Sequence, residues 1–336
     1  MPRARLALAA ALLSTAAVLP LAAQAAPEVV VDVPPIHSIV ARVMAGVGTP
    51  RLLLAPGTSP HDYALRPSDA RAIAGADLLV WVGPSLDPWL DEAADSLGAG
   101  TRLTLETLPD LTLLPFRSAR DVGGGGAEAG DADGHDPAPE AAGAGGQDHG
   151  PEHDHDHDHE HAGGLDPHVW LDPGNAIAIA EATAHALSEA DPDHAAAYAA
   201  NATAFAAETK ALETDIARLL APAQGRGYVV FHDAYQYLEA RFHLPSAGAI
   251  LLADGARPSA AHVSRLRAAL ATAQVRCVFT EPEFDPALAA TLVEGTDIRI
   301  GRLDGLGLDL TAGPDLYPAL MRGLADNLAD CLAPAS

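Results

Sequence analysis

Residues 194–221 read HAAAYAANATAFAAETKALETDIARLLA, a long segment of helical composition with no internal glycine or proline. At about 1.5 Å per residue, a helix of this length spans roughly 40 Å, which is long for a globular helix and sufficient to run between two domains. Apolar strands alternate with helices on both sides of it. The segment therefore predicts a connecting helix, over residues 191–221, between two lobes.

The N-terminal lobe is expected over residues 26–190. Apolar runs with the length of buried strands are separated there by helical patterns. The expected strands are 28–33, 51–55, 77–83 and 101–107, and the expected helices are 36–46, 68–76, 87–98 and 175–189, with Ser68 as the N-cap of the second helix and Gly98 at the end of the third. Strands and helices that alternate at this spacing predict a parallel α/β sheet.

The C-terminal lobe, residues 222–336, repeats the pattern. The expected strands are 228–231, 246–252, 275–281 and 297–303, and the expected helices are 234–242, 259–274 (with Ser259 as N-cap) and 314–332. The predicted fold class is therefore α/β, with two Rossmann-like parallel-sheet lobes joined by one long helix.

Residues 1–25 have the organisation of a secretory signal peptide. Arg3 and Arg5 form a basic start, residues 6–21 are apolar, and Ala-Gln-Ala at 23–25 fits the small-x-small cleavage rule. No later segment approaches the ~20 apolar residues of a membrane span. No cysteine stands near the cleavage point to carry a lipid. We expect an exported, soluble protein without a lipid anchor.

The formal net charge is −25 with histidine neutral. This balance argues against a nucleic-acid partner, which needs a basic face, and is compatible with attracting cations. The chain has two cysteines, Cys277 and Cys331. In an oxidising compartment such a pair predicts a disulfide, worth roughly 4 kcal/mol for a loop of about 55 residues; two buried free thiols are the alternative.

Residues 118–164 interrupt the first half with Gly, Ala, Asp, Glu and His and almost no large apolar side chain. Such a composition cannot offset the entropy of ordering, so we expect a disordered insertion. It contains HDHDHDHEH at 153–161, whose alternation of imidazole and acid favours weak, exchangeable zinc sites. The accessory candidates are His149, His153, His155, His157, His159 and His161; a merely solvating insert is the alternative.

Polar residues follow the carboxyl ends of several expected strands, where ligands bind in parallel α/β sheets. They are His37, His61, His232, Glu281 and Asp304, and His168 follows the insertion. Imidazoles combined with a carboxylate suit Zn²⁺. Taken singly, a histidine in a loop is more often a surface or helix-capping residue than a ligand, and the spacing of these residues in the sequence does not change that.

A family resemblance favours the metal site. The segments PGTSPHDYALRPSD, LDPHVWLDPGNA, YVVFHDAYQYLEARF, CVFTEPEF and IGRLDGLG are similar, in this order, to the periplasmic zinc-binding proteins of zinc-uptake ABC transporters. The resemblance extends over nearly the whole mature chain. It implies two lobes rigidly linked by one long helix, with the metal in the cleft between them. It also supports a Cys277–Cys331 bridge.

The resemblance implies that His61, His168 and His232 are the zinc-binding imidazoles. For the fourth position, some relatives use an aspartate where Asp304 stands, while others use a glutamate just before the first histidine, or water. Ser59 and Pro60 precede His61 here, so Asp304 is the expected fourth ligand. Manganese receptors of this group tend to have glutamate at the position of His232, so a histidine there favours zinc.

Other polar residues have expected supporting roles. Asp62 and Asp233 are candidates to orient a ligating imidazole through its second nitrogen, with helix capping as the alternative. Glu281 is a candidate for the same role, or for contact with the transporter. His37 is a cleft candidate whose alternative is a structural position in the first turn of a helix.

Three functions remain open at this point. The first is a receptor that captures Zn²⁺ and delivers it to an inner-membrane permease driven by a cytoplasmic ATPase, acting as a monomer and exchanging metal with periplasmic zinc chaperones. The second is a zinc buffer or metallochaperone centred on the histidine-rich insertion. The third is a zinc hydrolase, although the chain lacks a motif such as HExxH that places a general base beside the metal.

Overall fold

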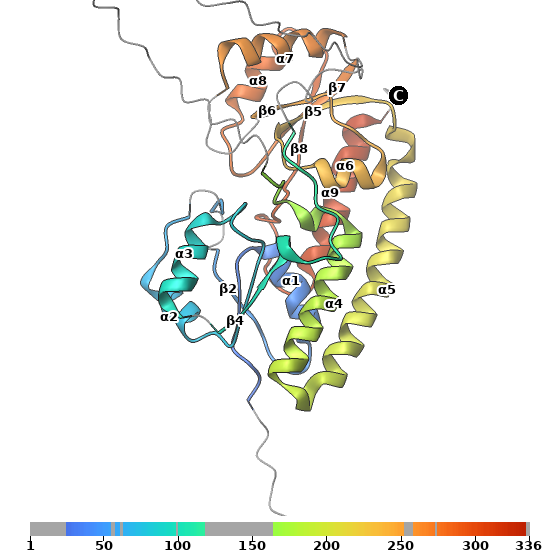
Figure 1. Ribbon diagram of the computed structural model, residues 1–336. Coiled ribbons are helices and arrows are strands. Elements are labelled where there is room, and N and C mark those ends of the chain that lie inside the picture. The colour runs from blue at the N-terminus through green and yellow to red at the C-terminus, as the bar shows by residue number, and fades with distance from the viewer. Residues whose placement is uncertain are drawn as a thin grey trace, which may run out of the picture.

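The computed structural model describes residues 25–54, 58–60, 63–98, 100–117, 164–251, 258–272 and 274–333. The signal-like segment 1–24 and the insertion 118–163 lie outside this range. Two parallel sheets form separate lobes, with long helices beside both (Figure 1). Within the described residues no helix is both long enough and apolar enough to cross a bilayer.

The N-terminal sheet has the order β2-β1-β3-β4, with every pair parallel. Because successive side chains of a strand point to opposite faces, each strand contributes to two layers. Val30, Leu79 and Trp81 pack on one face, and Val31 and Val80 belong to the main core on the other. The strands are β1 (Val29–Val31), β2 (Arg51–Leu52), β3 (Leu78–Trp81) and β4 (Thr101–Thr104), and the helices between them are α1 (Pro34–Val43), α2 (Pro67–Ala74) and α3 (Pro88–Leu97).

The C-terminal sheet has the order β6-β5-β7-β8 and is also fully parallel. Its strands are β5 (Gly227–His232), β6 (Gly248–Leu251), β7 (Val275–Thr280) and β8 (Arg299–Arg302), and its helices are α6 (Gln236–Phe242), α7 (Ala260–Thr272), α8 (Ala287–Val293) and α9 (Leu316–Leu332). The predicted fold class is confirmed. Helix α8 was not predicted; its seven residues are too few to show a helical period.

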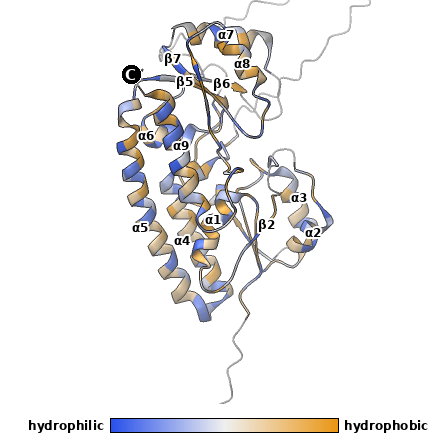
Figure 2. Ribbon diagram, turned by 180° about the vertical axis from the view of Figure 1, so that it is seen from behind, coloured by the Kyte–Doolittle hydropathy of each residue, from blue (hydrophilic) through white to orange (hydrophobic). Residues whose placement is uncertain are grey.

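The connecting helix is α5 (Ala195–Leu220), which lies against α4 (Pro173–Ala190) along its length. Tyr198, Phe205, Leu212 and Ile216 form its buried stripe, and Figure 2 shows hydrophobic and hydrophilic residues along the whole helix. This stripe belongs to a hydrophobic core that includes residues of both sheets, for example Val80 and Val230. The two lobes are therefore joined by shared packing as well as by the chain.

Helix α9 provides a second connection between the lobes. It packs on β7 and β8 of the C-terminal sheet and also on α1 and α5. At its first turn, the backbone N–H of Tyr317 donates to Ser38 Oγ (2.9 Å) and the Tyr317 hydroxyl donates to the Trp170 carbonyl (3.2 Å). The sequence predicted one helix between the lobes; two helices, α5 and α9, bridge them.

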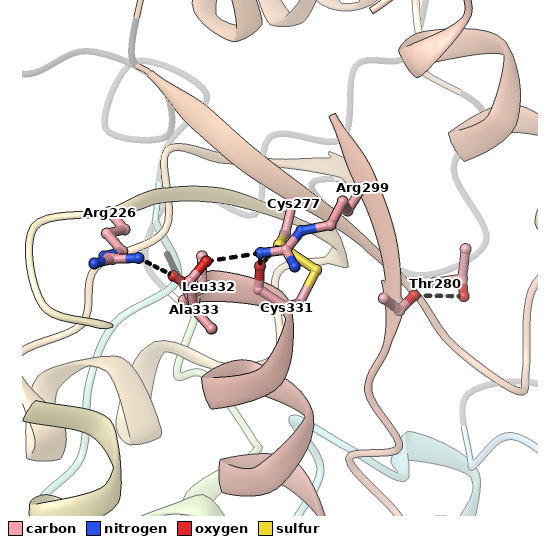
Figure 3. The surroundings of a disulfide bond; sticks show 8 residues. Arg226, Cys277, Thr280, Arg299, Cys331, Leu332 and Ala333 are labelled. Carbon is pink, nitrogen blue, oxygen red and sulfur yellow. Dashed lines mark hydrogen bonds between the residues drawn. A yellow bond between two sulfur atoms is a disulfide. The ribbon is translucent and has the colours of Figure 1, made fainter. Parts of the chain in front are cut away.

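The expected disulfide between Cys277 of β7 and Cys331 of α9 is present, with the two Cα atoms 6.1 Å apart. Figure 3 shows two arginines at the same helix end. Arg226 donates to the Leu332 carbonyl, and Arg299 donates to the carbonyls of Cys331 and Ala333. These bonds satisfy carbonyls that the last turn of a helix leaves without partners. The disulfide and the hydrogen bonds from the two arginines thus fix the end of α9.

Two of the predicted caps are confirmed and one is wrong. Gly98 ends α3 in the left-handed conformation (φ 69°), and Ser259 Oγ accepts the N–H of His262 at 3.2 Å. Ser68, however, lies inside α2, whose N-cap is Arg66. Pro67 fixes φ for the first helical position and holds the preceding residue extended, so the helix begins two residues earlier than an N-cap at Ser68 implies.

Candidate metal site

His232 is the last residue of β5 and is buried, with 5% of its surface exposed. Glu281, which follows β7, contacts it twice: Oε1 accepts the backbone N–H of His232 at 3.1 Å, and Oε2 lies 2.8 Å from Nδ1. A carboxylate beside Nδ1 favours the tautomer with its proton there, which makes Nε2 the lone-pair nitrogen. This arrangement is the one that favours Nε2 as a metal-binding nitrogen.

His168 has the same arrangement with a different carboxylate. Oδ1 of Asp166 accepts the backbone N–H of His168 at 3.0 Å and lies 2.8 Å from its Nδ1. Both side chains are buried. Asp166 was not among the predicted residues, although the D-x-H spacing is a local signal, since an aspartate commonly accepts from the backbone two residues ahead.

The two imidazoles lie side by side. The ring centroids of His168 and His232 are 5.4 Å apart, with an angle of 66° between the planes. Each ring has a buried carboxylate at Nδ1, from Asp166 and Glu281 respectively. Two imidazoles that can each present Nε2 are ligands suited to Zn²⁺. The structure thus brings together two of the three predicted histidines.

The remaining predicted ligands differ in what the structure shows. His61 and its neighbour Asp62 lie outside the described residues, as do the six accessory histidines of the insertion. Asp304 is half-buried after β8, and its Oδ1 and Oδ2 accept the N–H groups of Leu308 (2.9 Å) and Asp309 (3.0 Å). Each oxygen keeps a second lone pair. Among the described residues alone, no group of three or more His, Cys, Asp or Glu side chains is arranged to hold a metal ion.

Aromatic residues form the walls around the two imidazoles. Trp170 is 5.4 Å from the His168 ring and donates Nε1–H to the Gly305 carbonyl at 2.8 Å, beside Asp304. Tyr235 lies 6.2 Å from the His232 ring. Burial raises the pKa of the Tyr235 phenol, and the negative charges of Glu281, Glu283 and Asp304 raise it further. These carboxylates create a negative field around the imidazoles, which attracts cations.

The contacts of Asp233 differ from those that were predicted for it. It was expected to orient an imidazole or to cap a helix; instead its carboxylate binds the Arg117 guanidinium, with Nε donating to Oδ2 at 3.1 Å and Nη2 to Oδ1. Arg117 also donates to Glu239 Oε2 at 2.5 Å. The reason is geometric: Asp233 follows the last residue of β5, so its side chain points away from that of His232.

His37 occupies the structural position that was its alternative interpretation. It lies in the first turns of α1, buried, with Nε2 3.1 Å from the Pro50 carbonyl oxygen. Burial lowers the pKa of the His37 imidazole, which therefore stays neutral. Its hydrogen bond joins α1 to the residue before β2, and the described structure gives it no role at the metal site.

A second pair of buried acids, absent from the sequence predictions, lies at the carboxyl ends of β1 and β3. Asp32 accepts the N–H groups of Val33 (2.7 Å) and Val82 (2.6 Å), and Asp87 accepts Nε1–H of Trp89 (3.2 Å). Burial raises the pKa of Asp32 to about 7. Burial, and then the charge of Asp32, raise the pKa of Asp87. Both carboxyl groups therefore keep their protons to a higher pH than an exposed aspartate does.

Comparison with known proteins identifies the family of the chain. The profile of the family described as "Zinc-uptake complex component A periplasmic" matches residues 29–331. The chain belongs to this family. The high-affinity zinc uptake system protein ZnuA of Paracoccus denitrificans is 47% identical over 324 residues, covering 96% of each chain. The ZnuA protein of Brucella suis is 44% identical over 315 residues, covering 91% of each.

Solved structures support the fold. A crystal structure described as ZnuA has a TM-score of 0.70 at 21% identity, covering 92% of this chain and 100% of that one. A mutant of the laminin-binding adhesin Lmb from Streptococcus agalactiae also has a TM-score of 0.70 at 21% identity, covering 91% and 99%. As a member of its family, the protein is a periplasmic zinc-binding component of a zinc-uptake ABC system, with zinc as its cargo, and is not an enzyme.

Proposed function

We propose that the protein binds its zinc cargo through His61, His168 and His232, with Asp304 as the fourth ligand. The contact between the rings of His168 and His232, each with a buried carboxylate at Nδ1, is the observation that supports this best. Three imidazoles and one carboxylate complete the tetrahedral shell that Zn²⁺ prefers. His61 enters the proposal through its motif and its place after β2.

The carboxylates of Asp166 and Glu281 give this site its orientation. Asp166 Oδ1 lies 2.8 Å from Nδ1 of His168, and Glu281 Oε2 lies 2.8 Å from Nδ1 of His232. A carboxylate at this distance favours a proton on Nδ1 and leaves Nε2 for the metal. Zinc competes with protons for imidazole nitrogen, and binding therefore weakens as the solution becomes acidic. A closed four-ligand shell leaves no position for an activated water, which is consistent with capture and not with hydrolysis.

The family and the sequence support a proposal for how the protein is exported and how it exchanges zinc. Residues 1–25 direct export and are removed, and the mature protein is a soluble periplasmic monomer without a lipid anchor. It delivers zinc to the permease and ATPase of its transporter and accepts zinc from periplasmic chaperones. Helices α5 and α9 and the core shared by the two lobes restrict hinge motion, so release relies on small local rearrangements.

The insertion supplies weak accessory sites, and a zinc buffer centred on it is the competing function. The two are separated by calorimetric zinc titration of three full-length chains: wild type, a chain with all seven histidines of residues 118–163 replaced by asparagine, and His61→Ala. The first two should retain one tight site, and His61→Ala should lose it while keeping the weak ones. Loss of tight binding in the asparagine-substituted chain would instead establish the buffer.

A further inference from the structure

The insertion leaves and re-enters the described structure through a short stem, residues 114–117 and 164–166. Its two segments run antiparallel, with a bridge between Pro115 and Leu165. The N–H of Phe116 donates to the Gly164 carbonyl at 3.0 Å, and the N–H of Asp166 donates to the Leu114 carbonyl at 2.8 Å. Asp166, which contacts His168, is therefore part of the stem.

Helix α6 of the C-terminal lobe binds both segments of the stem. Gln236 Nε2 donates to the Pro115 carbonyl at 3.0 Å and to Asp166 Oδ2 at 3.1 Å. The Tyr237 hydroxyl donates to the Asp166 carbonyl at 2.9 Å and accepts the N–H of Leu114 at 3.0 Å. Asp166 is thus held at its backbone and at its second carboxylate oxygen, while its first oxygen orients His168.

Arg117 joins the end of the stem to the turn that follows His232. Its guanidinium binds two buried carboxylates at once, Asp233 at the end of β5 and Glu239 in α6. An arginine fork that binds a carboxylate through two nitrogens fixes direction as well as distance. Without the arginine, two buried negative charges would lose their counterion, which is a strongly unfavourable change.

We propose that the stem and α6 form one support, joined by three positioning residues, Arg117, Gln236 and Tyr237. This support preassembles His168 and His232 as the two-imidazole half of the zinc site. The inference rests on the proposed function. His168 precedes α4 in the chain, yet its orienting carboxylate is held by α6 of the C-terminal lobe. The half-site therefore keeps its geometry whether or not His61 is engaged.

The test uses full-length protein in which the seven histidines of residues 118–163 are asparagine, so that accessory sites do not contribute. In this background Arg117→Met should weaken zinc binding at least tenfold and speed zinc dissociation, and Arg117→Lys should recover part of the affinity. The control is Arg226→Met, which removes another arginine with a buried backbone partner, far from the stem. Equal affinity in Arg117→Met and Arg226→Met would overturn the proposal.

A second comparison isolates the half-site. His61→Ala in the same background should still bind one zinc, more weakly, and adding Arg117→Met should abolish that residual binding. If Arg117→Met does not fold, Gln236→Leu and Tyr237→Phe decide the question, because each removes two hydrogen bonds between the stem and α6. A purely structural link would lower the unfolding free energy of these variants and leave zinc affinity unchanged.

Failure of the support and failure of the metal site give different results. If the background chain, with His61, His168 and His232 intact, does not bind one zinc tightly, the proposed ligand set is wrong. If it binds zinc tightly and none of the stem variants alters affinity or dissociation rate, only the positioning role is wrong.

Discussion

Glu281 Oε2 lies 2.8 Å from Nδ1 of His232, and Oε1 of the same carboxylate accepts the backbone N–H of His232 at 3.1 Å. One side chain thus fixes both the main chain and the ring of a residue that comes from a different strand. Such outer partners commonly control metal affinity by 10- to 100-fold.

The first prediction concerns this carboxylate. Glu281→Gln keeps the size of the side chain but removes the charge that supports the Nδ1 proton, and we expect a zinc affinity roughly 10- to 100-fold lower. Competition titration against a zinc chelator measures the change. Glu294→Gln, an exposed glutamate, is the matched control. An affinity within twofold of wild type for Glu281→Gln would show that the carboxylate does not tune the imidazole.

The second prediction separates two roles of Asp304. Both of its oxygens accept backbone N–H groups of the turn 304–309, so the residue is already explained as a structural cap. If it is also a ligand, Asp304→Ala should lower zinc affinity about tenfold or more, in addition to reducing the free energy of unfolding. Asp309→Ala is the control, because Asp309 lies in the same turn and its exposed side chain pairs with Arg302 of β8. A stability loss without an affinity loss would leave capping as the only role.

The third prediction concerns the disulfide. Cys277 and Cys331 are 54 positions apart in sequence, and a cross-link over such a loop stabilises a protein by roughly 4 kcal/mol in the chain-entropy model. Replacing both with serine should therefore lower the free energy of unfolding by a few kcal/mol, measured by urea denaturation of the zinc-free protein. Zinc affinity should change little, because the bond is remote from His168 and His232. A difference below 1 kcal/mol would contradict the expectation.

The sequence was sufficient for the fold and for part of the site, for a physical reason. Alternation of apolar strands with helices determines a parallel sheet, and polar residues at the carboxyl ends of its strands, such as His232 and Glu281, mark where a ligand binds. What the pattern cannot supply is the partner of each residue. Glu281 meets His232 across 49 positions, and Arg117 meets Asp233 across 116.

The local signal at Asp166 lies beside a stronger signal in the sequence. The histidine-rich insertion is a much stronger metal-binding pattern than the stem at its base, where Asp166 lies two residues before His168. The bridging role of α9 was not readable either, since its contact with Ser38 joins residues from opposite ends of the chain. Asp32 and Asp87 carried no metal or catalytic motif, and only their burial in the folded structure identifies them as a pair.

The last prediction concerns this pair. The pKa of Asp32 is raised to about 7 in the folded protein, against 3.8 for an unperturbed aspartate, chiefly by burial. Between these values the folded state binds more protons than the unfolded state, so the pair stabilises the protein at low pH and this stabilisation is lost as the pH rises toward 7. The linkage amounts to at most about 1.4 kcal/mol per pH unit for one proton.

Asp87→Asn isolates the effect, because the asparagine amide can donate to Asp32 at every pH, whereas the Asp87 carboxyl group can donate only while it is protonated. The free energy of unfolding of the variant, relative to that of wild type, should rise by more than 1 kcal/mol from pH 5 to pH 8. Urea denaturation of the zinc-free proteins measures it. Asp110→Asn, at an exposed position, should show no such trend. Since Trp89 Nε1 lies 3.2 Å from Asp87 and 3.4 Å from the Pro60 carbonyl, just before His61, the same variant also tests whether this proton influences the loop that carries the third proposed ligand. If Asp87→Asn binds zinc with wild-type affinity at both pH 5 and pH 8, the acid pair affects stability and not zinc binding.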